Sequence, residues 1–111
     1  ITRKNIYCFL SITSTKEPSF VSIYRQETGQ TRILEGGEEK LVYRIKLGTK
    51  NNRYEVTNEL PQSVPMKSSL NFIEVPVKVN KIEILEIFAG VKNSTYNEFI
   101  KVEFRDIPLS E

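Results

Sequence analysis

The chain has 111 residues and a net charge of +2, and 39% of its residues are hydrophobic. This length predicts a single domain, residues 1–111, and no apolar run is long enough for a membrane helix. Histidine is absent and Cys8 is the single cysteine, which removes the commonest catalytic bases and metal ligands. We therefore expect no catalytic residues, no metal and no cofactor, and the interspersed charges predict no nucleic-acid partner.

Alternation of apolar and polar residues with a period of two, which is typical of strands, runs through most of the chain. In chain order it predicts strands at residues 5–14, 19–26, 41–47, 53–57, 70–75 and 100–105. Turn residues separate them at 28–30, 35–38 and 48–52, and prolines make residues 60–67 irregular. With the stretch considered next, about seven to eight short strands predict an all-β antiparallel β-sandwich.

Residues 81–104, KIEILEIFAGVKNSTYNEFIKVEF, fit two different structures. Apolar residues between Ile84 and Val91 recur at helical spacing, and Asn80 and Gly90 are suitable helix caps. The isoleucines concentrated at the start of the stretch, in a chain otherwise composed of strands, favour two strands joined by a polar loop. We predict the second arrangement.

The same stretch resembles the C-terminal end of discoidin-like domains, which are galactose-binding-like jelly rolls. The residues that carry the resemblance are Ile82, Glu83, Ile84, Leu85, Ile87, Phe88, Gly90, Tyr96, Asn97, Val102, Glu103 and Phe104. The resemblance covers residues 69–104, whereas the Trp-rich N-terminal segments common in that family are missing. It implies a jelly-roll sandwich whose loops bind a ligand, although a fold does not dictate which ligand.

Two loops contain the groups that a saccharide needs, namely cations, amides and aromatic rings. An ordinary hairpin connection has a similar composition, so each loop is also compatible with a purely structural role. The predicted ligand-binding residues are Lys92, Asn93, Tyr96 and Asn97 in one loop and Asn51, Arg53 and Tyr54 in the other.

These features predict a non-catalytic binding module that recognises a carbohydrate or a protein surface through loops at one end of the sandwich. The first alternative is a structural or protein-interaction β-domain of a secreted or cell-surface assembly, which would bind by a strand edge or an apolar patch. The second is a C2-like domain that binds membranes or polyanions, which the single aspartate, Asp106, disfavours. We expect no membrane partner, and the sequence leaves the oligomeric state open.

The chain begins with Ile1 rather than methionine, so we expect it to be part of a larger protein. Residues 93–95, Asn-Ser-Thr, form a glycosylation sequon, which favours an extracellular or cell-surface location.

Overall fold

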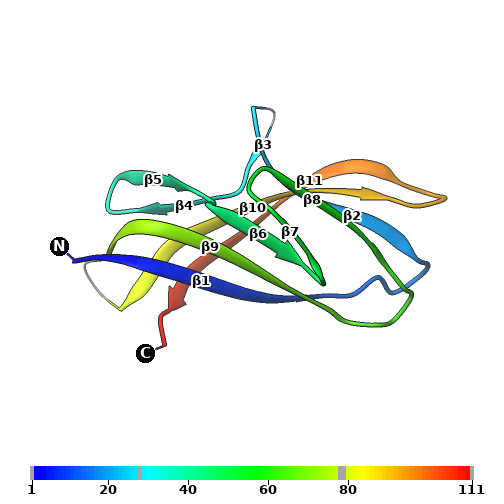
Figure 1. Ribbon diagram of the computed structural model, residues 1–111, viewed down its shortest axis with the longest axis horizontal. Coiled ribbons are helices and arrows are strands. Elements are labelled where there is room, and N and C mark those ends of the chain that lie inside the picture. The colour runs from blue at the N-terminus through cyan, green and yellow to red at the C-terminus, as the bar shows by residue number, and fades with distance from the viewer. Residues whose placement is uncertain (1, 28, 78–79, 111) are drawn as a thin grey trace.

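A computed structural model describes residues 2–27, 29–77 and 80–110, and in these ranges it contains eleven strands and no helix. The antiparallel strands pack as a sandwich 47 Å long and 22 Å thick (Figure 1), which confirms the predicted all-β sandwich. The strands are Thr2–Ile12 (β1), Ser19–Gln26 (β2), Gly29–Gln30 (β3), Arg32–Glu35 (β4), Glu38–Leu41 (β5), Arg44–Leu47 (β6), Lys50–Asn52 (β7), Glu55–Leu60 (β8), Met66–Val77 (β9), Lys81–Lys92 (β10) and Asn97–Pro108 (β11).

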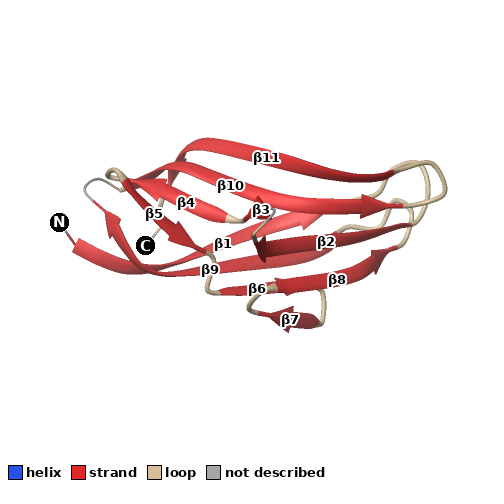
Figure 2. Ribbon diagram, turned by 90° about the horizontal axis from the view of Figure 1, so that it is seen from above, coloured by secondary structure: helices blue, strands red, loops and turns tan. Residues whose placement is uncertain are grey.

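The strands form two sheets of unequal size. The smaller sheet has four strands in the order β1-β9-β6-β7. The larger has seven, in which β3-β2-β10-β4-β5 form one path, β8 pairs with β2, and β11 pairs with β10. Figure 2 shows β11 at one margin of the molecule and β7 at the opposite margin. The two long margins of the sandwich are therefore formed by different strands.

Strand β10 is the central strand of the larger sheet. On one side it pairs with β11 along its whole length, from Lys81 with Pro108 to Lys92 with Asn97. On the other side it pairs first with β4 and then with β2. Residues 81–104 thus form strand, loop and strand, as predicted. In a strand, Leu85, Ile87 and Ala89 point to the same face, and in this sheet that face packs on the core.

Residues 41–47 do not form one strand, and this prediction was wrong. Leu41 ends β5 in the larger sheet, while Arg44 begins β6 in the smaller sheet. The crossing occurs at two residues, because the Val42 amide donates to the Thr31 carbonyl at 2.9 Å and the Tyr43 amide donates to the Asn71 carbonyl at 2.7 Å. The apolar-polar alternation continues across the crossing, so the sequence pattern does not reveal it.

Four short strands, β3, β4, β5 and β7, raise the total above the seven to eight that the sequence predicts. Each has two to four residues, too few for a period-two pattern to be recognised. The predicted turn between β4 and β5 is confirmed, since Gly36 and Gly37 have φ values of 58° and 78°.

One long side of the sandwich is closed by contacts between the two sheets. Strand β8 belongs to the larger sheet, and its Asn58 side chain donates from Nδ2 to the Leu47 carbonyl of β6 at 3.1 Å. Leu47 and Leu60 are fully buried beside this bond. The opposite side, between β1 and β11, lacks an equivalent bond among the described residues, and it contains the features considered next.

Candidate functional site

Strand β11 is an edge strand whose core-facing side chains are exposed. Ile100, Val102 and Phe104 alternate with outward-facing charged residues, and their exposed fractions are 40%, 37% and 40%. Their neighbours on β10 point in the same direction but are buried: Ile87, opposite Val102, is only 6% exposed. The difference arises because β11 is an edge strand whose inner face borders a groove, whereas β10 has strands on both sides and packs on the core.

An apolar groove runs between β1 and β11 along this open side. It consists of two adjoining cavities of about 430 and 630 Å³, which share Leu10 of β1 and Phe104 of β11 in their walls. The floor of the first cavity comes from core residues of the larger sheet, including Ile23, Ile87 and Leu60. The groove therefore reaches down to the hydrophobic core, while its exposed apolar surface comes from the strands at its rim.

Both strands that border the groove have one unpaired edge. Within residues 2–27, 29–77 and 80–110, β1 pairs with β9 alone and β11 pairs with β10 alone. An unpaired edge presents backbone donors and acceptors that an additional strand is able to satisfy. The open side thus combines an apolar surface with two free backbone edges.

Cys8 lies on the groove side of β1, in the wall of the second cavity. Burial between the two sheets raises the pKa of its thiol to about 11. A thiol with so high a pKa carries little thiolate at neutral pH, which does not suit a nucleophile.

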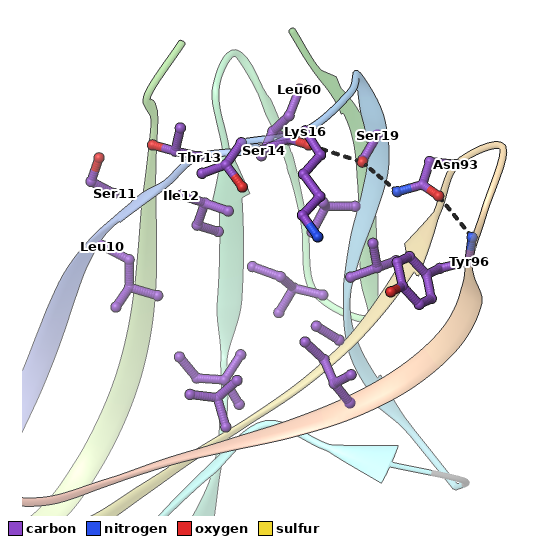
Figure 3. Close-up of a pocket in the computed structure, with 18 of the residues that line it drawn as sticks. Leu10, Ser11, Ile12, Thr13, Ser14, Lys16, Ser19, Leu60, Asn93 and Tyr96 are labelled. Carbon is purple, nitrogen blue, oxygen red and sulfur yellow. Dashed lines mark hydrogen bonds between the residues drawn. The ribbon is translucent and has the colours of Figure 1, made fainter. Parts of the chain in front are cut away.

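The polar end of the groove contains the predicted residue Asn93, and its side chain holds the β10–β11 loop together (Figure 3). Its Oδ1 accepts from the Thr95 amide at 2.9 Å and from the Tyr96 amide at 2.7 Å. Its Nδ2 donates to the buried Ser19 Oγ at 3.0 Å. The Asn93 amide is therefore occupied by contacts within the protein.

The same loop is fastened to the β1–β2 connection by Glu17. The Ser94 amide donates to Glu17 Oε1 at 2.9 Å, and the Thr95 hydroxyl donates to Oε2 at 3.3 Å. Hydrogen bonds from Ser94 lower the pKa of Glu17. Tyr96 remains exposed at the mouth of the groove, where Lys16 also reaches toward the cavity (Figure 3).

The second predicted loop lies far from the first. Lys92 and Phe20 are paired at the start of β2, whereas the Tyr54 carbonyl accepts from the Arg25 amide near the end of β2. Five residues of extended strand separate Phe20 from Arg25, a distance of roughly 16 Å. The seven predicted residues therefore form two separate groups rather than one site.

In the second group, the Arg53 guanidinium lies 4.6 Å from the Tyr43 ring centroid and 5.7 Å from that of Tyr54. Asn51 accepts a hydrogen bond from Arg44 Nη1 at 2.9 Å. Arg53 and Asn51 are thus each engaged by a neighbouring side chain, while the Tyr54 ring is exposed.

The outer face of the larger sheet carries an ion cluster and an aromatic cluster. Glu86 is buried between Arg32, whose Nε lies 2.6 Å from Oε1, and Lys101, whose Nζ lies 3.4 Å from Oε2. The Arg32 hydrogen bond lowers the pKa of Glu86. Beside it, the Phe88 and Phe99 rings stack at 5.9 Å. Strand β11 is thus fixed to β10 by its outer face, although its inner face is open.

No protein-family model matches the chain, and no curated protein or solved structure resembles it significantly. Among the described residues, no helix is long and apolar enough to cross a membrane. The same residues contain no cluster of three or more His, Cys, Asp or Glu side chains arranged to hold a metal ion.

The open side is not apparent from the sequence alone. The alternation of residues 100–105 is visible in the sequence and predicts an apolar face, but such a face is normally covered by the opposite sheet. Ile107 of β11 also lines the groove. Only the folded structure shows that Ile100, Val102 and Phe104 are left partly uncovered.

Proposed function

We propose that this domain is a non-catalytic protein-interaction module that binds another polypeptide chain along its open side. The observation that carries the proposal is the exposure of Ile100, Val102 and Phe104 on a strand with a free edge. A partner strand that pairs with β11 would satisfy backbone groups and bury apolar surface at the same time. The free backbone edge and the exposed apolar side chains both belong to β11.

A saccharide bound by the β10–β11 loop is less well supported by the geometry. The Asn93 Oδ1 already accepts from Thr95 and Tyr96 and its Nδ2 donates to Ser19, which leaves one donor hydrogen at most for a ligand hydroxyl. The two predicted loops lie too far apart to act on one small ligand. The resemblance to galactose-binding-like jelly rolls remains a prediction, and the proposal does not rest on it.

The proposal predicts that a displayed library of alternating apolar and polar peptides, each of about twelve residues, yields binders to the domain. Val102→Glu should lower the affinity for the selected peptides by about tenfold or more, because a charge then faces the buried side of the added strand. Affinity is measured by titration calorimetry.

The matched control is Ile73→Glu, since Ile73 of β9 is also β-branched and also 37% exposed but lies away from the groove. It should leave peptide affinity unchanged, and thermal melts establish that both variants fold. A library without binders, together with a glycan-array signal that Tyr96→Ala abolishes, would overturn the proposal in favour of saccharide binding.

A further inference from the structure

We infer that the polypeptide that pairs with β11 is a second copy of this chain, an inference that rests on the proposed function. Two copies of an edge strand pair antiparallel across a twofold axis perpendicular to the sheet. If both sandwiches are to keep their cores on the same side, the axis must pass through a residue, so that core-facing side chains lie opposite core-facing ones. Few registers meet this condition.

The register centred on Val102 is self-complementary in charge and in shape. It places Val102 opposite its own copy and Ile100 opposite Phe104 of the second copy, all on the core-facing side. On the outer side it places Lys101 opposite Glu103, and Phe99 opposite Arg105. Opposite charges and apolar pairs directly across a strand pair are stabilising, and an arginine beside a phenyl ring is a favourable cation–π neighbour.

The other registers are opposed by the same side chains. An axis at Lys101 places that lysine opposite its own copy, and an axis at Glu103 places two glutamates together and Lys101 opposite Arg105. Like charges directly opposite one another are destabilising. An axis at Ile100 places Glu98 opposite Val102, and an axis at Phe104 pairs only residues 103–105 before the strand departs from extended geometry at Asp106. The sequence of β11 therefore specifies one register.

The structure also limits the length of this pairing. Asp106 has a φ of 53°, in the left-handed region, so the strand departs from extended geometry after Arg105. At the other end, β11 begins at Asn97, which pairs with Lys92 of β10. In the register centred on Val102, the partners of Asn97 and Glu98 would lie beyond Arg105, so the dimer pairs residues 99–105.

The outer charges are free to rearrange on association. Lys101 is 60% exposed and Arg105 64% exposed, and their present partners lie at 3.4 Å and 3.3 Å. In the dimer, Lys101 gains Glu103 of the second copy while it remains beside Glu86. Such exposed pairs set the register and the choice of partner more than the affinity.

Charge reversal tests the inference on the full chain by sedimentation velocity over a range of protein concentrations. Wild type should form a dimer, and Lys101→Glu and Glu103→Lys should each weaken it about tenfold or more. The double variant should restore it. An equimolar mixture of the two single variants should form a heterodimer, because each supplies the charges that the other lacks. Lys46→Glu, on the exposed face of β6, is the matched control and should not change dimerisation.

Disulfide cross-linking tests the same register without changing a charge. In a Cys8→Ala background, Val102→Cys should form an interchain disulfide readily, because directly opposite residues have Cα atoms about 4.5–5.5 Å apart. Ile100→Cys faces the same side but should not cross-link. In this register, residue 100 lies opposite residue 104 of the second copy, so the two introduced cysteines are four residues apart along the strand. Rapid cross-linking of Ile100→Cys instead of Val102→Cys would overturn the register.

A wild-type chain that remains a monomer at all concentrations would overturn the inference itself. The peptide library and Val102→Glu still test the proposed function in that case, since neither requires a second copy. Peptide binding by a monomeric protein would therefore mean that the open side binds a different chain.

Discussion

Glu86 shows how a buried charge is accommodated on the outer face of the larger sheet. Arg32 and Lys101 contact opposite oxygens of its carboxylate, and Arg32 also pairs with Glu39. The Arg32 hydrogen bond holds the pKa of Glu86 below its ordinary value of 4.5. A carboxyl group with a lowered folded-state pKa stabilises the fold above its unfolded pKa and loses that contribution as the pH falls through the folded pKa.

Glu86→Gln should therefore lower the free energy of unfolding at pH 7 by about 1–3 kcal/mol. It should also flatten the decline in stability below pH 4.5 that the lowered Glu86 pKa predicts for wild type. Urea denaturation at pH 7, 4.5 and 3 measures both effects. Glu59→Gln, at an exposed position of β8, is the control and should change neither. If Glu86→Gln lost stability below pH 4.5 as steeply as wild type, this account would be contradicted.

At the scale of the element, β10 depends on Thr31 at the point where its partner changes. Ile84–Glu86 pair with β4 and Ala89–Lys92 pair with β2, which leaves the amide of Phe88 without a strand partner on that side. The fully buried Thr31 hydroxyl accepts from this amide at 3.1 Å. The side chain thus replaces one hydrogen bond of the sheet ladder.

Thr31→Val, which keeps the shape and removes the acceptor, should cost about 1–3 kcal/mol of stability because it leaves a buried amide unsatisfied. Thr31→Ser should retain most of the stability. The measurement is urea unfolding followed by circular dichroism, with Thr57→Val as the control, since Thr57 is exposed and water is able to replace its bond to Ser22. Equal losses in Thr31→Val and Thr57→Val would refute the role of Thr31.

The strands that the sequence predicts best are those with long alternating patterns. Residues 19–26 match β2 because local alternation alone specifies that strand, whereas the strand, loop and strand of residues 81–104 are confirmed although their spacing also fits a helix, because the isoleucine content favours strands. The crossing at Val42 and Tyr43 was not predictable, because it depends on Thr31 and Asn71, which are distant in sequence. The candidate site was missed for a related reason: the exposure of Val102 depends on which strand lies beneath it.

At the scale of the whole molecule, Cys8 reports on how closely the two sheets pack at the open side. Its thiol faces the groove, yet burial raises its pKa from 9.0 to about 11. At pH 8 the folded protein should then contain about one hundredfold less thiolate than the unfolded chain.

The rate of reaction of Cys8 with a soluble disulfide reagent at pH 8 should accordingly be about one hundredfold lower in buffer than in urea. The reaction is followed by absorbance, with free cysteine under both conditions as the control for the effect of urea on the reagent. Similar rates for the protein in buffer and in urea would mean that the two sheets separate readily along the groove.

Asn93 begins the Asn-Ser-Thr sequon and also connects the β10–β11 loop to β2 through Ser19. Its Nδ2 is the atom to which an oligosaccharide is attached at a sequon, and in the folded protein this atom donates to the buried Ser19 Oγ. A sugar at this atom would leave it one hydrogen and would have to fit beside the buried Ser19 that now accepts its bond. Any glycosylation of Asn93 would therefore be easier before the loop closes than after, so the timing of folding would decide how accessible this nitrogen is.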